Sequence, residues 1–166
     1  MSTRDHRPTL LILTALVILA DRLSKNWIVA HILPGHAITL IPRVFRLTHV
    51  LNTGAAFSLG ESISPLLLRN GLIAFSVIAV FIVAVMLWRV GRELNLTSIA
   101  LALILGGAIG NLYDRIHLQH VVDFLEVHIV HYHWPDFNVA DSCIVIGAGL
   151  LLLEIFRPQP VTDPSV

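Results

Sequence analysis

The chain has 166 residues, of which 55% are hydrophobic and only 13% are charged. Soluble domains usually carry about 25% charged residues, so this composition favours a membrane protein over a water-soluble one. Lysine plus arginine and aspartate plus glutamate both number 11, and this balance gives no surplus of positive charge with which to bind nucleic acid.

Four segments are long and apolar enough to be membrane-spanning helices, which need roughly 20 residues each. In chain order they lie at about 9–30, 66–88, 96–113 and 137–156. The first segment resembles a secretory signal, but Asp21 and Arg22 stand where a cleavage site would need small residues, so we expect a retained helix. The sequence therefore predicts an all-α membrane protein with four transmembrane helices in a single domain, residues 1–157.

The connections between these segments differ in character. Residues 43–51, between the first two segments, are rich in Val, Phe, Leu and Thr with partial alternation, which predicts short strands. The connection at 116–136 is rich in histidine, and we expect an exposed loop there. Residues 158–166 contain several prolines, so we expect a disordered tail.

Arginines in the connections favour one orientation in the membrane, because cytoplasmic loops are enriched in Lys and Arg. The side that holds both termini carries Arg4, Arg7, Arg89, Arg92 and Arg157. The opposite side carries Arg43, Arg46 and Arg69. We therefore expect both termini, and with them the tail, to lie in the cytoplasm.

Most of the unusual polar residues belong to one side of this four-helix arrangement. The end of the first helix, the start of the second, the end of the third and the start of the fourth all meet there. The residues concerned are Asp21, Lys25, Asn52, Asn111, Asp114, Arg115, Asp123, Asn138 and Asp141. Ionisable groups at membrane depth are costly, so they face the bundle interior and mark functional sites by default. The orientation above places this side outside the cytoplasm.

Several of these residues also have a purely structural interpretation. Asp21 and Lys25 are four residues apart, a spacing that forms an ion pair on one helix face. Asn138 and Asp141 fit the cap and the third position of a helix N-terminus, where a carboxylate is favoured. Asp123 is harder to explain this way, because its neighbours on both sides are large and apolar.

A convergence of Asp123 and Asp141 would supply both an acid and a base. Two carboxylates that lie close together cannot both ionise cheaply, so one keeps a proton near neutral pH. A water held between them could then attack a peptide carbonyl without a covalent intermediate. We expect Asp141 to be the ionised member, because a helix N-terminus favours negative charge.

Four sequence blocks resemble the lipoprotein signal peptidase family, and the resemblance covers roughly residues 8–157. The blocks are DRLSK at 21–25, NTGAAFS at 52–58, GGAIGNLYDR at 106–115 with VVDF at 121–124, and FNVAD at 137–141. The resemblance implies a type II signal peptidase, an intramembrane aspartyl peptidase. Such an enzyme cuts bacterial prolipoproteins before a diacylglyceryl-modified cysteine.

The resemblance also implies the roles of individual residues. The catalytic pair would be Asp123 and Asp141. Supporting or substrate-binding positions would be Asp21, Lys25, Asn52, Gly54, Asn111, Arg115, Asn138 and Ala140. Arg22 departs from the pattern, because the family often has glutamine there.

The resemblance also implies where the protein lies in the cell and what it binds. It implies a multi-pass protein of the bacterial cytoplasmic (inner) membrane, in contact with membrane lipid, with its active site near the outer leaflet. It implies a small extracytoplasmic β-rich cradle between the first two spans, and inhibition by the cyclic peptide globomycin. It implies no cofactor.

Three alternatives remain open at this point. His117, His120, His128, His131 and His133 suggest a metal site, but the HExxH spacing of zinc proteases is absent, so we expect no catalytic metal. A small proton-coupled transporter would also place carboxylates inside the bundle, although its charges should then form a path across the membrane. A structural subunit of a membrane complex would have no need of paired carboxylates.

Overall fold

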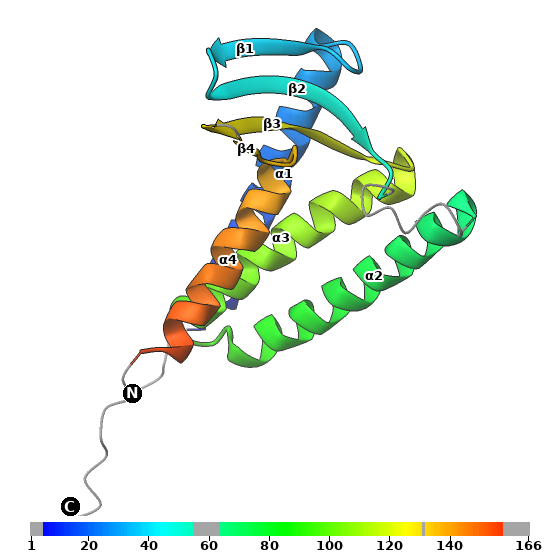
Figure 1. Ribbon diagram of the computed structural model, residues 1–166. Coiled ribbons are helices and arrows are strands. Elements are labelled where there is room, and N and C mark those ends of the chain that lie inside the picture. The colour runs from blue at the N-terminus through cyan, green and yellow to red at the C-terminus, as the bar shows by residue number, and fades with distance from the viewer. Residues whose placement is uncertain (1–4, 55–63, 131, 158–166) are drawn as a thin grey trace, which may run out of the picture.

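The computed structural model describes residues 5–54, 64–130 and 132–157, and it is mostly helical with a small antiparallel sheet (Figure 1). Its helices are α1 (Arg7–His31), α2 (Pro65–Val90), α3 (Leu96–His117) and α4 (Val139–Ile155). Its strands are β1 (Ala37–Ile41), β2 (Phe45–Asn52), β3 (Val121–Ile129) and β4 (Tyr132–His133). Arg4, His131, residues 55–58 of the second motif block and the tail at 158–166 lie outside the described residues.

Polar caps fix where the middle helices begin. The hydroxyl oxygen of Ser64 accepts a hydrogen bond from the backbone N–H of Leu67 and starts α2, with proline at its first position. Asn95 starts α3 by accepting a hydrogen bond from the backbone N–H of Ser98 at 2.9 Å. Each cap satisfies one of the backbone donors that a helix N-terminus leaves unpaired.

The central helix of the bundle is α3, which packs against α1, α2 and α4. Its glycines allow this close approach. A Cβ atom at Gly106 would lie 2.7 Å from Cβ of Val17 on α1, and one at Gly107 would lie 2.3 Å from the carbonyl oxygen of Ala140 on α4. Small residues at helix contacts are typical of membrane bundles.

Among the described residues, two helical stretches are long and apolar enough to cross a membrane, namely Leu66–Val90 in α2 and Leu96–His117 in α3. The apolar side chains of α2 are largely exposed, as expected for a surface that faces lipid. By contrast, α1 carries Asp21 and Lys25 along its length, and α4 has only 17 residues. That these two helices also cross the membrane stays a prediction.

The sheet lies at one end of the helices, as Figure 1 shows, and its strand order is β1-β2-β3-β4. The strand predicted at 43–51 is confirmed by β2. The exposed loop predicted at 116–136 is wrong, because β3 occupies residues 121–129 and pairs antiparallel with β2. The sheet is therefore built from both connections, the one after α1 and the one after α3.

The sequence did not reveal β3 because its pairing partner is distant along the chain. Its first four residues are all buried, so the strand shows no alternation of apolar and polar residues. Val122 and Phe124 pack with Ile28 and Ile32 at the end of α1. This contact fixes the sheet against the helices.

The glycine contacts of α3 generate a stability prediction. Gly107→Ala should destabilise the protein by about 1–3 kcal/mol, because its new methyl group meets backbone of α4 that cannot move aside. Gly149→Ala in α4 is the matched control, because a Cβ there has no neighbour within 4 Å. Thermal unfolding in detergent micelles measures both, and equal midpoints for the two variants would contradict the packing described here.

Candidate active site

One stripe of α1 packs against the rest of the protein, and two of its members are charged. The buried residues of α1 recur every three or four positions, which is the spacing of one helix face. They are Leu10, Thr14, Val17, Asp21, Lys25 and Ile28. Asp21 is 0% exposed and Lys25 is 1% exposed, so both charges depend on partners inside the protein.

The ammonium group of Lys25 lies at the centre of a buried network. Its Nζ lies 2.8 Å from Oδ2 of Asp21, 2.9 Å from Oδ2 of Asp114 and 3.1 Å from Oδ1 of Asn111. A lysine has three N–H donors, and these three contacts satisfy all of them. The ion pair expected between Asp21 and Lys25 is therefore confirmed, and it is shared with α3.

The remaining carboxylate oxygens of this network bind other elements. Oδ1 of Asp21 accepts a hydrogen bond from the backbone N–H of Ala140 in α4 at 3.1 Å. Oδ1 of Asp114 pairs with Arg22, and its Oδ2 lies 3.4 Å from the backbone N–H of Val122 in β3. The network thus joins α1, α3, α4 and β3.

Asn138 caps α4 and contacts both of the carboxyl groups singled out by the sequence. Its Oδ1 accepts from the backbone N–H of Asp141 at 3.0 Å, while Oδ2 of Asp141 accepts from the backbone N–H of Asn138 at 3.2 Å. The expected capping arrangement is therefore present. The side-chain Nδ2 of Asn138 donates to Oδ1 of Asp123 at 2.7 Å.

A second asparagine, Asn111 on α3, connects the ion network to the same pair. Its Nδ2 donates to Oδ1 of Asp141 at 2.7 Å, and its Oδ1 accepts from Lys25 and from Nδ2 of Asn138. Asp123 and Asp141 are therefore held by one continuous chain of side-chain amides. The structure thus links Asp123 to Asp141 through Asn111 and Asn138, although none of these three residues is adjacent to Asp123 in the sequence.

Asp123 lies on β3, is 2% exposed and faces a pocket of about 300 Å³. Its Oδ2 accepts a hydrogen bond from Nδ2 of Asn52, at the end of β2, at 2.9 Å. The pocket is lined by Val50, Leu51, Asn52, Thr53, Asp123, Pro135 and Asp136. Asp141 is half-buried, accepts a hydrogen bond from Nδ2 of Asn111, and is not among the residues that line this pocket.

The surroundings of Asp123 raise the pKa of its carboxyl group. Burial raises the pKa of Asp123 from its ordinary 3.8 to about 6, and the negative charge of Asp141 acts in the same direction. Hydrogen bonds from Asn52 and Asn138 and the charge of Lys25 oppose this rise without cancelling it. A carboxyl group with a pKa near 6 can donate a proton at a pH where an ordinary aspartate cannot.

Gly54 and Arg115 lie at the edge of this arrangement. Gly54 has φ +84°, a conformation that side chains disfavour, and its N–H donates to Oδ1 of Asn52 at 2.8 Å. A Cβ atom there would also lie 2.3 Å from Cδ1 of Leu72. Arg115 is half-buried, its Nη1 donates to the backbone carbonyl oxygen of Asn111 at 3.5 Å, and within the described part of the chain it forms no ion pair.

Three residues of this region were not assigned a role from the sequence. Asp114 completes the buried ion network, and its spacing of three residues from Asn111 on α3 was the signal that could have found it. Arg22 pairs with Asp114 and stacks on the Tyr113 ring at 4.4 Å. The arginine that stands where the family often has glutamine therefore has defined contacts in this structure. Asp136 accepts a hydrogen bond from Thr48 and lines the pocket.

Comparisons with known proteins show the family to which the chain belongs. The family model described as signal peptidase (SPase) II matches residues 13–157. The lipoprotein signal peptidase of Pseudomonas putida is 45% identical over 154 residues, which is 92% of this chain and 89% of the relative. The lipoprotein signal peptidase of Syntrophotalea carbinolica is 41% identical, over 89% of this chain and 91% of the relative.

Two solved structures, each described as a bacterial membrane enzyme, have the same fold. One is 25% identical in sequence with a TM-score of 0.77, and the alignment covers 96% of this chain and 99% of that one. The other is 24% identical with a TM-score of 0.78, covering 100% of this chain and 98% of that one. The chain therefore belongs to the signal peptidase II family, a family of aspartyl-type peptidases.

Proposed function

We propose that this chain is an intramembrane endopeptidase that removes signal peptides from bacterial prolipoproteins, cutting before the diacylglyceryl-modified cysteine. The observation that carries the proposal is the shared asparagine support of Asp123 and Asp141. Asn138 donates to both carboxyl groups, from its side chain to Asp123 and from its backbone N–H to Asp141, and Asn111 connects Asp141 to the buried ion network. Family membership supplies the class of substrate.

In the proposed mechanism the two carboxyl groups act on one water molecule. Asp141, at the N-terminus of α4, is the carboxylate that removes a proton from the water as it attacks the scissile carbonyl. Asp123, whose pKa is raised to about 6 by burial, carries the proton in the reactive form of the enzyme and donates it to the carbonyl oxygen. Asp141 then gives the proton that it took from water to the leaving nitrogen as the C–N bond breaks, and Asp123 regains its proton from the hydroxyl group that becomes the new carboxyl group. No covalent intermediate forms.

The neighbouring residues hold the pair and the substrate. Asn52 and Asn138 fix the two oxygens of Asp123, so that its proton is directed rather than free to rotate. The pocket beside Asp123 has room for an extended segment of peptide. Gly54 and Arg115 border the site, and we assign Arg115 to a carbonyl of the bound substrate, because its guanidinium presents several donors.

The proposed topology follows from where the site lies along the helices. The sheet and the start of α4, which Asn138 caps, lie at one end of the bundle, while the end of α4 lies at the other (Figure 1). With four spans and both termini in the cytoplasm, the site lies near the outer leaflet of the bacterial inner membrane, in contact with lipid. A globomycin-type cyclic peptide would occupy the same pocket.

The catalytic pair is tested by isosteric substitution. Asp123→Asn and Asp141→Asn should each lower the cleavage of a lipid-modified prolipoprotein by at least ~100-fold, because general acid–base groups typically contribute ~10²–10⁴-fold. Asparagine keeps the size of the side chain and one acceptor oxygen. Asp5→Asn, at the exposed start of the described chain, is the matched control and should cleave normally.

The same proteins separate this proposal from transport. Each is reconstituted into liposomes and assayed for proton flux under a pH gradient. Unchanged cleavage by both aspartate variants would contradict the assignment of Asp123 and Asp141 as the catalytic pair. Flux that the wild type shows and the variants lose, with no cleavage by the wild type, would favour the proton-coupled transporter.

The assignment of the proton is tested by a pH titration in the infrared. The protonated carboxyl band of Asp123 should be present below pH 6 and disappear as the pH rises through about 6, because burial raises its pKa to that value. The band should be missing from Asp123→Asn and retained in Asp5→Asn. A titration near pH 6 that survives in Asp123→Asn would reverse the roles of the two aspartates.

The bracing role that we propose for Lys25 is tested by stability. Lys25→Met keeps the length of the side chain but leaves Asp21 and Asp114 buried without their shared cation. Removing one partner of a buried ion pair typically costs about 3–5 kcal/mol. Thermal unfolding in detergent should show a large loss, and adding Asp21→Asn to the variant should restore part of it. A Lys25→Met protein as stable as the wild type would contradict the role.

A further inference from the structure

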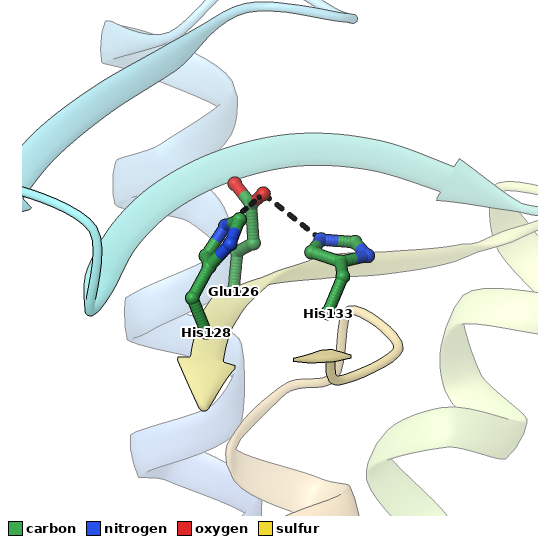
Figure 2. A group of neighbouring side chains, drawn as sticks. All are labelled: Glu126, His128 and His133. Carbon is green, nitrogen blue, oxygen red and sulfur yellow. Dashed lines mark hydrogen bonds and ion pairs between the residues drawn. The ribbon is translucent and has the colours of Figure 1, made fainter. Parts of the chain in front are cut away.

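A second cluster of polar side chains lies on the sheet, away from the aspartate pair. Glu126 and His128 come from β3 and His133 comes from β4, and Figure 2 shows both imidazoles directed at the same carboxylate. Oε1 of Glu126 lies 2.8 Å from Nε2 of His128 and 2.9 Å from Nε2 of His133. The three candidate ligand atoms all lie within 4.8 Å of one another.

The sheet itself creates this convergence. Side chains two apart on a strand share a face, so Glu126 and His128 lie on the same side of β3, opposite to the side of Asp123. His128 and His133 are directly paired across the β3–β4 ladder. The histidine-rich connection that the sequence predicted to be an exposed loop therefore presents an ordered group in which Glu126 is only 5% exposed.

We propose that Glu126, His128 and His133 bind one divalent transition-metal ion of the zinc class. Two imidazoles and one carboxylate are a donor set that zinc favours, and they leave a fourth position for water. Ligand atoms about 2.0–2.2 Å from a tetrahedral zinc ion stand about 3.3 Å apart. The two nitrogen–oxygen separations need to widen by about half an ångström to reach this geometry, and the two imidazole nitrogens, which lie within 4.8 Å of each other, need to stand at the same spacing. His133 is half-exposed, so the ion can reach the site from solvent.

The second carboxylate oxygen of Glu126, Oε2, lies beside an arginine that can orient the carboxylate toward a metal ion. Oε2 is buried and lacks a hydrogen bond within the described residues, but Nε of Arg46 lies 3.2 Å away. Arg46 stands opposite Glu126 on β2. In metal sites a ligating carboxylate is itself held by such a neighbour, which orients the oxygen that binds the ion. The two imidazole nitrogens favour a zinc-class ion over calcium or magnesium, which prefer oxygen ligands.

The metal would brace the pocket wall and take no part in peptide cleavage. The chain continues from His133 through Pro135 and Asp136, which line the pocket beside Asp123, to the cap of α4 at Asn138. An ion that joins β3 to β4 fixes the start of this segment. Its position on the opposite face of β3 from Asp123 keeps it away from the reacting groups. The proposal does not depend on the function proposed above.

The test uses the purified full chain in detergent, stripped with a chelator and titrated with Zn²⁺ alone by isothermal calorimetry. The wild type should bind one zinc ion per chain. Glu126→Gln and His133→Ala should each weaken binding by more than about 100-fold, because losing an outer partner alone typically costs ~10–100-fold. His36→Ala is the matched control: His36 is an exposed histidine before β1, and its removal should leave the affinity unchanged.

Two further readouts decide the outcome. X-ray absorption of the zinc-loaded wild type should show two imidazole nitrogens bound to the ion, and zinc should raise the thermal midpoint of the wild type but not of His133→Ala. His133 is half-exposed, so this variant keeps its fold, which circular dichroism verifies. A wild type that binds no zinc, or a His133→Ala protein that binds it equally well, overturns the proposal and leaves a hydrogen-bonded cluster only.

Discussion

The buried ammonium group of Lys25 is the contact on which the rest of this structure depends. A charge removed from water is tolerated only when it is paired and its hydrogen-bonding groups are satisfied. Lys25 meets both conditions through Asp21, Asp114 and Asn111, and Arg22 supplies the second cation that balances the two carboxylates. Because the partners come from α1 and α3, the relative position of these helices is fixed by charge as well as by shape.

The asparagines extend this order to the aspartate pair without adding charge. A side-chain amide donates and accepts at the same time. Asn111 accepts from Lys25 and donates to Asp141, and Asn138 accepts from the backbone of Asp141 while it donates to Asp123. A carboxylate in either position would bring a third negative charge beside the pair, and an aliphatic residue would leave buried oxygens without donors. Amides satisfy both requirements.

The sheet explains how two carboxyl groups from one stretch of chain meet. Asp123 and Asp141 are 18 residues apart (141 − 123), too far for a single helix or turn to join them. The chain runs outward along β3, reverses at β4 and returns to the start of α4. Pairing of β3 with β2 anchors the outward run and places Asn52 beside Asp123. One face of β3 thus serves the pocket, and the other presents Glu126 and His128.

What the sequence determined by itself was local. Apolar length predicted the helices, and four-residue spacing predicted the ion pair of Asp21 and Lys25. The pattern of Asn138 and Asp141 predicted a helix cap, because each of these features depends on residues within one or two turns. The resemblance of four sequence blocks to a known family pointed to the aspartate pair, but nothing local to Asp123 indicated what would surround it.

What only the tertiary structure decided was non-local. The sequence predicted a loop where β3 lies, because the buried start of this strand shows no alternation of apolar and polar residues. The partner strand β2 is also distant along the chain: Leu51 pairs with Val122, about 70 residues later. Asp114 gained its role from a cation on another helix. The raised pKa of Asp123 arises from burial, and burial is a property of packing rather than of the neighbouring sequence.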